Sequence, residues 1–143
     1  RPVNLGANRW AIRIGAPMVL PFGKNPAQLY FLEMTPSLML YTKNTAAFGG
    51  SERTQDPMFV LENHLSHNFT KQFWASADLR LQEGGETHTD GAKDDNRISQ
   101  LGGGGTLGYT ILPPLGVQVS YGTILTSNGG EGDMIRARIT MMF

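Results

Sequence analysis

The last ten residues of the chain alternate between apolar and polar side chains. Apolar side chains occupy every second position from Ile135 to Phe143, and the positions between them include Arg136, Arg138 and Thr140. Because successive side chains of a β-strand point to opposite faces, this pattern predicts a strand with one apolar and one polar face. A single strand of this kind is also common in soluble proteins, where its apolar face packs in a core. The interpretation therefore depends on whether the pattern recurs.

The same alternation recurs upstream and predicts about seven long strands. They cover residues 10–16, 30–40, 58–66, 73–82, 101–111, 117–125 and 134–143. Several have roughly ten residues, against about five to six for an average strand. Pro36 lies inside the second strand and cannot donate a ladder hydrogen bond, so we expect a bulge or bend there. The strand at 58–66 is the least regular, because Asn63 and His67 interrupt its apolar face.

Short turns alternate with long polar loops between these strands. Residues 68–71 and 113–116 are short enough for hairpin turns, whereas residues 42–57 and 83–97 are long and hydrophilic. Outer-membrane barrels show this asymmetry, with short periplasmic turns and longer extracellular loops, and a soluble β-sandwich gives no reason for it. The predicted fold class is therefore all-β: an antiparallel up-and-down meander of about seven long strands, part of an outer-membrane-type β-barrel.

Composition agrees with this prediction. Hydrophobic residues make up 40% of the 143 residues and charged residues only 17%, which is low for a soluble surface. The 12 basic and 12 acidic residues balance, so we expect no nucleic-acid partner. The chain has no Cys, which excludes disulfides, thiolate zinc sites and cysteine nucleophiles. No apolar run approaches the roughly 20 residues that a membrane helix needs.

The number of strands bears on the domain organisation. Residues 1–143 are expected to form a single β-barrel domain, but bacterial single-chain barrels have an even number of strands, so about seven should not close alone. We therefore expect the chain to be the C-terminal portion of a longer barrel, closed by upstream strands or by another chain. The start at Arg1, without an initiator Met or a signal peptide, fits this expectation.

No segment carries a recognisable catalytic, cofactor or metal-binding motif. The glycines at 102–105 lack the Gly-Lys-Ser/Thr ending of a phosphate-binding loop. We expect them to permit sharp curvature or to leave room for a bulky neighbour, for which Trp74 on the adjacent strand is the natural candidate. The acidic residues at 90–96 lack the spacing of an EF-hand, so a solvated loop is expected. His64 and His67 would face opposite sides of a strand, which prevents joint metal binding. We therefore expect no enzyme activity, no cofactor and no metal.

Charged residues gather on the face opposite the apolar one, and we expect this face to line a lumen. The predicted lumen-lining residues are Arg9, Arg13, Phe31, Glu33, Glu62, His64, Trp74, Asp78, Arg80, Gln118, Arg136 and Arg138. Their charges either pair with one another and fill the lumen or line a conduit, and in a barrel both can hold. The mixture of signs argues against steering of one charge sign. Aromatic rings on this face could instead stack on a flat apolar solute, and Arg could pair with a phenolate or carboxylate.

Several short segments occur in a recognisable order along the chain. They are Asn-Leu-Gly-Ala-Asn-Arg-Trp at 4–10, Gln-Asp-Pro at 55–57 followed by His64, Trp74, Gly-Gly-Glu-Thr at 84–87 with Asp-Gly at 90–91, and the final Phe143. In these segments and their spacing, the chain resembles the C-terminal half of outer-membrane proteins associated with the meta pathway of phenol degradation. The resemblance implies a barrel linked with uptake of aromatic or other hydrophobic compounds. Family members are substantially longer, so substrate-binding residues in their N-terminal part lie outside this chain.

Our hypothesis from sequence is a porin-like channel or transporter for small hydrophobic or aromatic compounds in the outer membrane of a Gram-negative bacterium. It implies as partners membrane lipid and lipopolysaccharide, the outer-membrane assembly machinery with Phe143 as its assembly signal, and a small hydrophobic or aromatic solute. The alternative is a structural or assembly β-protein, completed by other chains and without transport activity. A flux measurement in liposomes separates the two.

Overall fold

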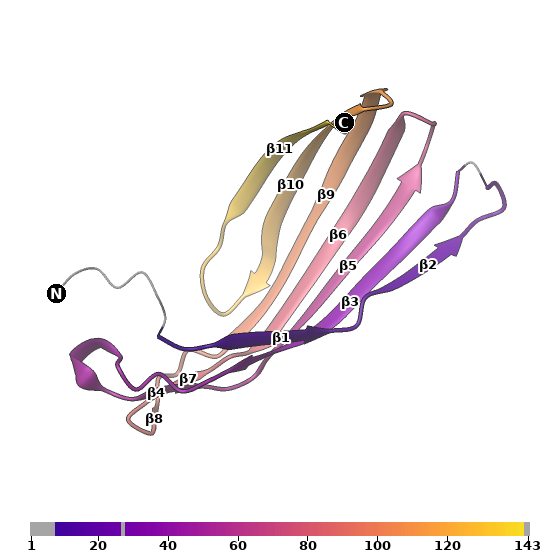
Figure 1. The fold of residues 1–143 in the computed structure, drawn as a ribbon. Helices are drawn as coiled ribbons and strands as arrows, with labels where there is room; N and C mark the ends of the chain where they lie inside the picture. Colours follow the sequence, from indigo (N-terminus) through magenta and orange to yellow (C-terminus); the bar gives the residue numbers. More distant parts are fainter. Residues whose placement is uncertain (1–7, 27, 142–143) are drawn as a thin grey trace.

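The computed structural model describes residues 8–26 and 28–141, and Phe143 lies outside the described residues (Figure 1). The described residues form two antiparallel sheets, and their only helical segment is a short 3-10 turn, η1 (Phe48–Gly50). None of the described helical structure is long and apolar enough to cross a membrane. The prediction of an all-β chain is confirmed.

The larger sheet is a meander in which each long strand pairs with the next along the chain. The strand order is β1-β3-β5-β6-β9-β10-β11, and β2 also pairs with β3. The strands are β1 (Ala11–Gly15), β2 (Met18–Phe22), β3 (Tyr30–Tyr41), β5 (Met58–Asn68), β6 (Phe73–Gly84), β9 (Ile98–Leu112), β10 (Leu115–Ser127) and β11 (Asp133–Met141). Since β1 and β2 lie end to end along β3, the sheet is seven strands wide, as predicted.

Two prolines explain why the first strand is divided into β1 and β2. The register against β3 is the same on both sides of the break, which falls where Pro17 meets the part of β3 that contains Pro36. Neither proline nitrogen can donate a ladder hydrogen bond, although the amide of Ala16 still donates to the Pro36 carbonyl at 3.0 Å. Of the bulge or bend expected at Pro36, the bulge is wrong, because β3 pairs with β5 without a register shift. The carbonyl of Pro36 points to the first strand, so its missing N–H falls on that side and leaves the β5 ladder intact.

The larger sheet curves into an open trough (Figure 1). Among the described residues, the outer edges of the first strand and of β11 have no partner. The expectation that these strands do not close into a barrel by themselves is therefore confirmed for the described part of the chain.

Large apolar side chains cover the convex face of the trough. Leu79, Leu107 and Ile139 are 49%, 58% and 74% exposed, and all three point to this face. Among the described residues, Met58 and Val60 are the only buried hydrophobic side chains, and both lie on the opposite face. The apolar face of this sheet therefore packs against no other part of the chain that the structure describes, which is the reverse of a soluble sandwich.

Glycines in the middle of β9 let the neighbouring strand approach closely. A Cβ atom at Gly104 would overlap the carbonyl oxygen of Tyr121 on β10 and would lie 3.0 Å from the Cα atom of Gly122. A Cβ atom at Gly102 would meet its nearest atom, a backbone oxygen, at an ordinary 3.5 Å. Only glycine fits at Gly104, and this close approach accompanies the curvature of the sheet.

The expectation that Trp74 lies over the glycines at 102–105 is wrong. In the register of β6 against β9, Trp74 is opposite Gly108, three residues after the end of that run. Its indole ring occupies the space where a Cβ atom of Gly108 would be. The sequence predicted that a glycine would make room for this ring, but not which one, because alternation leaves the register between two strands open.

Replacing Gly108 with Ala is expected to displace the Trp74 ring and to destabilise the protein by about 1–3 kcal/mol, as in other overpacked sites. Acrylamide quenching of Trp74 fluorescence, in a protein whose other Trp residues are replaced by Phe, should increase in this variant. Unchanged quenching would show that the ring does not sit against Gly108.

The two long polar loops, at 42–57 and 83–97, form a second sheet that their hydrophilic composition did not predict. It consists of β4 (Arg53–Gln55), β7 (Thr87–Thr89) and β8 (Ala92–Lys93), in the order β4-β7-β8. This loop sheet lies at one end of the trough, and the short turns lie at the other (Figure 1). Gln55 Nε2 donates to the carbonyl of Gly85 at 2.7 Å, and Gly85 lies against the buried Met58. The loop sheet is therefore tied to the end of the concave face.

One face of the loop sheet is held together by Asp94, which lies in the segment expected to be a solvated acidic loop. Its Oδ2 atom accepts hydrogen bonds from Thr87, from Thr89 at 3.1 Å and from Arg53 at 3.3 Å. The Thr87 hydroxyl is the main reason that the pKa of Asp94 lies below its ordinary value of 3.8, with Thr89 and the Arg53 guanidinium adding to it.

Acidification is therefore expected to loosen the loop sheet. A carboxyl group whose pKa is lower in the folded state stabilises that state above its unfolded pKa, and this stabilisation is lost as the pH falls through the folded value. Hydrogen exchange at residues 85–97, corrected for its intrinsic pH dependence, should accelerate below about pH 4 in the wild type, near the Asp pKa of unfolded chains. The Asp94→Asn variant should lack this step, and identical profiles for the two proteins would contradict the assignment.

Candidate functional site

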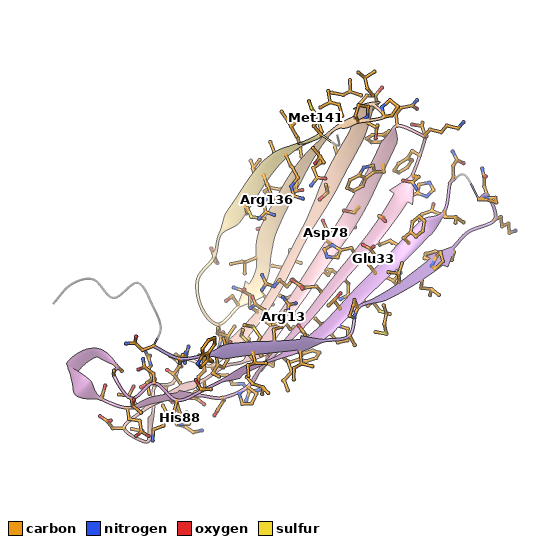
Figure 2. The ribbon with its side chains drawn as sticks, in the orientation of Figure 1. Arg13, Glu33, Asp78, His88, Arg136 and Met141 are labelled. Atoms are coloured by element: carbon orange, nitrogen blue, oxygen red, sulfur yellow. The ribbon has the colours of Figure 1, made fainter. Side chains whose placement is uncertain are left out.

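The polar residues of the larger sheet lie on its concave face. Residues directly opposite each other in an antiparallel ladder share a face, so Glu33, His64 and Asp78 form one row across β3, β5 and β6. Gln118 and Arg138 continue this face across β10 and β11. Figure 2 shows charged residues distributed along the trough from β1 to β11; those labelled are Arg13, Glu33, Asp78 and Arg136.

An ion-pair network on this face joins β1, β5 and β6. The Arg13 guanidinium lies 2.5 Å from Glu62 Oε2, and Arg80 Nε lies 3.7 Å from Glu62 Oε1. Arg13 also donates to the hydroxyl of Ser37, which is buried. One carboxylate thus lies between two guanidinium groups, so this part of the face keeps a positive charge.

A second polar network runs across β5, β6, β9 and β10. His64 Nδ1 lies 2.6 Å from Asp78 Oδ1, and Asp78 also accepts hydrogen bonds from Ser76 at 3.1 Å and Thr106 at 3.4 Å. The hydroxyl groups of Thr106 and Ser120 are 2.8 Å apart. Because each polar group has a partner, the network fixes the side chains in the middle of the concave face.

Two hollows lie on the concave face. The first, of about 500 Å³, is lined by Phe31, Glu33, His64, Ser66, Asn68, Trp74, Ser76, Asp78, Thr106 and Gln118. In the second, Arg80 and Arg136 lie around a floor that includes Gly102, Gly104 and Gly122. Nine of the twelve residues predicted from the sequence line one or both hollows: Phe31, Glu33, Glu62, His64, Trp74, Asp78, Arg80, Gln118 and Arg136.

The other three predicted residues lie outside the hollows. Arg13 belongs to the ion-pair network, and Arg138 is on the concave face of the edge strand β11. Arg9 donates to Gln55 Oε1 at 2.5 Å, and its guanidinium carbon lies 4.8 Å from the centre of the Tyr41 ring. It therefore ties the start of the first strand to the loop sheet.

The charges differ along the face in whether they are paired. Glu62 and Asp78, on the central strands, have partners, whereas Glu33, Arg136 and Arg138 make no ion pair within the described part of the chain. The central charges thus pair with one another, and Arg136 donates to the sulfur of Met134 at 3.7 Å. That the arginines of β11 line a conduit stays a prediction.

A column of rings lies on the convex side of the short-turn end, and sequence reasoning missed it. Ring centroids are 5.4 Å apart for Phe22 and Tyr30, 4.0 Å for Tyr30 and His67, 4.6 Å for His67 and Phe69, and 5.5 Å for Phe69 and Phe73. His67, which interrupts the apolar alternation, is thus part of an aromatic cluster. Aromatic girdles of this kind mark the membrane interface in outer-membrane barrels. Its rings come from segments that are distant in the sequence, so the pattern within one strand could not predict the column.

Comparison with solved structures identifies the fold. The crystal structure of an outer membrane channel from Pseudomonas putida F1 matches with a TM-score of 0.80 at 20% sequence identity. The match covers 96% of this chain and 50% of that chain, so the present chain spans about half the length of the channel. The chain therefore has the fold of part of an outer-membrane channel. No curated protein matches it in sequence.

The sequence itself identifies the family. Residues 1–139 match the family described as "Putative MetA-pathway of phenol degradation", which covers nearly the whole chain. The resemblance found in the order of short segments is thereby confirmed. The chain belongs to this family, and its larger antiparallel sheet has the fold of part of an outer-membrane channel.

Proposed function

We propose that the chain forms about half of the wall of a channel in the bacterial outer membrane that passes small hydrophobic or aromatic compounds. The observation that carries the proposal is the division of the sheet into two faces. Large exposed apolar side chains occupy the convex face, and two polar networks with two hollows occupy the concave face. Lipid on the convex side and water on the concave side satisfy both faces, as in known barrels.

The dimensions of the strands support this placement. A strand of 12 residues such as β6 rises about 40 Å at roughly 3.4 Å per residue, and a tilt of about 40° leaves roughly 31 Å across the bilayer. The hydrocarbon core of a bilayer is about 30 Å thick. The aromatic column then lies at one membrane interface, and the loop sheet lies outside the membrane with lipopolysaccharide as its neighbour.

Closure of the barrel requires further strands. The larger sheet is seven strands wide and the matched channel is twice as long, which supports completion by upstream strands or by another chain. On this proposal residues 1–143 are one part of a single barrel domain. The outer-membrane assembly machinery inserts it, with Phe143 as the assembly signal.

The concave face supports an aromatic solute. Phe31 and Trp74 line the first hollow, and a flat apolar ring gains favourable contact by stacking on such side chains. Arg136, which has no ion-pair partner within the described residues, lines the second hollow and can pair with a phenolate or carboxylate. A solute that combines a ring with an acidic group would use both hollows.

The experiment that tests this proposal is uptake of a phenolic compound by cells that express the full-length protein. The Phe31→Ala, Arg136→Ala double variant should take up the compound several-fold more slowly at matched outer-membrane levels. The Phe59→Ala, Lys24→Ala double variant removes an aromatic ring from the convex face and a charge from a turn, so it should retain the wild-type rate. Equal rates in all three proteins would remove this solute path.

Flux through liposomes distinguishes a channel from a scaffold. Full-length protein in liposomes should release a trapped phenolic compound faster than empty liposomes do. A folded, inserted protein without flux would overturn the transport proposal and favour a structural or assembly role.

A further inference from the structure

Three metal-binding side chains lie on one face of the loop sheet. In the pairing of β4 with β7, Thr54 is opposite His88, and the same register places Asp56 opposite Glu86 just beyond the strand ends. The amide of Asp56 donates to the carbonyl of Glu86 at 2.8 Å, which confirms that pair. Glu86 and His88 are two residues apart on one extended segment, so they share a face. One donor atom each from Asp56, Glu86 and His88 lies within 4.8 Å of the others.

The imidazole of His88 has a nitrogen without a partner. Its Nε2 atom is shielded from solvent and makes no hydrogen bond to any described residue. Asp56 Oδ1 lies 3.3 Å from this nitrogen, but the two groups are not aligned for a hydrogen bond. A buried polar atom in a folded protein normally has a hydrogen-bond partner, so a nitrogen that lies near a carboxylate without bonding to it indicates a missing ligand.

The cation nearest to this group is weakly engaged. Lys93 Nζ lies 3.8 Å from Glu86 Oε2, longer than a hydrogen bond, and its side chain is 66% exposed. The Glu86 side chain is only 13% exposed and that of His88 21%, whereas that of Asp56 is 55% exposed. The metal-binding groups of Glu86 and His88 are therefore mostly buried between the loops, whereas the carboxylate of Asp56 is accessible from solvent.

The opposite face of the loop sheet is different. There Arg53 donates hydrogen bonds to Thr87 and Asp94, and Thr87 donates to Asp94, so each of these three groups has a partner. The face with Asp56, Glu86 and His88 combines two carboxylates with an imidazole, and the buried nitrogen of that imidazole has no hydrogen bond to a described residue.

We propose that Asp56, Glu86 and His88 bind a Zn²⁺ ion that cross-links the two long loops. Zn²⁺ takes imidazole nitrogen and carboxylate oxygen at about 2.0–2.2 Å, which places tetrahedral donors roughly 3.3–3.5 Å apart, with water able to fill the fourth position. The 3.3 Å between His88 Nε2 and Asp56 Oδ1 already fits this geometry. Ca²⁺ and Mg²⁺ prefer sites made of oxygen alone, so the imidazole favours a transition metal.

The ion would hold together segments that are distant in sequence. Asp56 follows β4 in the first long loop, and Glu86 and His88 belong to the second (Figure 2 labels His88 at this end). A bound ion would therefore restrain the loop sheet at the end of the trough, independently of what passes through the barrel. The sequence alone did not suggest the site, because Asp56 is 30 residues from Glu86 in the chain and only the pairing of β4 with β7 brings them together.

Calorimetric titration of Zn²⁺ into the full-length protein, stripped of metal and held in detergent, tests the proposal. The wild type should bind one equivalent of Zn²⁺ with micromolar affinity that the His88→Gln variant does not bind. Asp56→Asn should weaken this equivalent at least tenfold. His64→Gln is the matched control, because it removes a histidine from the concave face, and it should retain the equivalent. Equal stoichiometry and affinity in wild type and His88→Gln would overturn the proposal, as would displacement of Zn²⁺ by equimolar Ca²⁺.

A second measurement keeps the test independent of folding defects. In the wild type, Zn²⁺ should slow proteolysis within residues 42–57 and 83–97 several-fold. In Asp56→Asn, whose altered side chain is half exposed and lies outside the strands, the same Zn²⁺ concentration, set near the Kd of the wild type, should give much less protection. Protection of both proteins to the same extent would exclude this site.

Discussion

Replacing Leu79 with Arg is expected to destabilise the membrane-inserted protein by about 2–4 kcal/mol, the cost of a lipid-facing Arg at the bilayer midplane of a barrel. Leu79 lies near the middle of β6, the central strand, and its side chain is 49% exposed on the convex face. Its neighbours across the sheet are Asn63 and Gly103, and neither carries a charge that could pair with an arginine. Urea unfolding of the full-length protein from lipid vesicles measures this difference.

The matched control places the same charge on the other face. Gln118→Arg adds a guanidinium to the first hollow, where water and polar side chains surround it, and it should cost less than about 1 kcal/mol. Equal destabilisation by the two substitutions would show that the two faces are wrongly assigned.

Gly104→Ala is expected to have the second-largest effect. A Cβ atom at this position would overlap the carbonyl oxygen of Tyr121, which belongs to the backbone of β10 and cannot move as a flexible side chain could. Separating β9 from β10 would disturb the ladder on both sides, and overpacking of this kind typically costs about 1–3 kcal/mol. The heat-induced shift of the folded band in gel electrophoresis should occur at a lower temperature.

Gly102→Ala is the control for this prediction. It adds the same methyl group two residues earlier on the same face, where the nearest atom would be 3.5 Å away. Its transition temperature should stay close to that of the wild type. A similar loss in both variants would mean that glycine is needed throughout the run for flexibility and not for close approach.

Alternation along each strand was enough to predict the faces of the sheet. Leu79 and Arg80 are neighbours in sequence, and a strand period of two residues places them on opposite faces whatever the fold around them. The strand count and the loop asymmetry followed from the same pattern. The structure places on the concave face every polar residue of the long strands that was predicted to line a lumen. The role of these residues in a lumen is still a proposal.

Features that depend on register could not be predicted in this way. The sequence indicates that Trp74 faces a glycine-rich strand, but only the pairing of β6 with β9 selects Gly108. The effect of Pro36 likewise depended on which neighbour its missing N–H faces. The group of Asp56, Glu86 and His88 exists only because two polar loops pair, and their composition gave no strand signal.

The central claim is that the convex face contacts lipid and the concave face contacts water. The chain contains no Cys, so single spin labels can be introduced at successive positions from residue 74 to residue 82 of the full-length protein, once any other cysteines are replaced. Electron paramagnetic resonance measures how often each label collides with oxygen, which concentrates in lipid, and with a water-soluble nickel complex. The ratio of the two collision rates should alternate from one position to the next along β6. Positions 75, 77, 79 and 81 should favour oxygen, and positions 74, 76, 78, 80 and 82 should favour nickel. Equal accessibility at neighbouring positions, or the reverse alternation, would contradict the account.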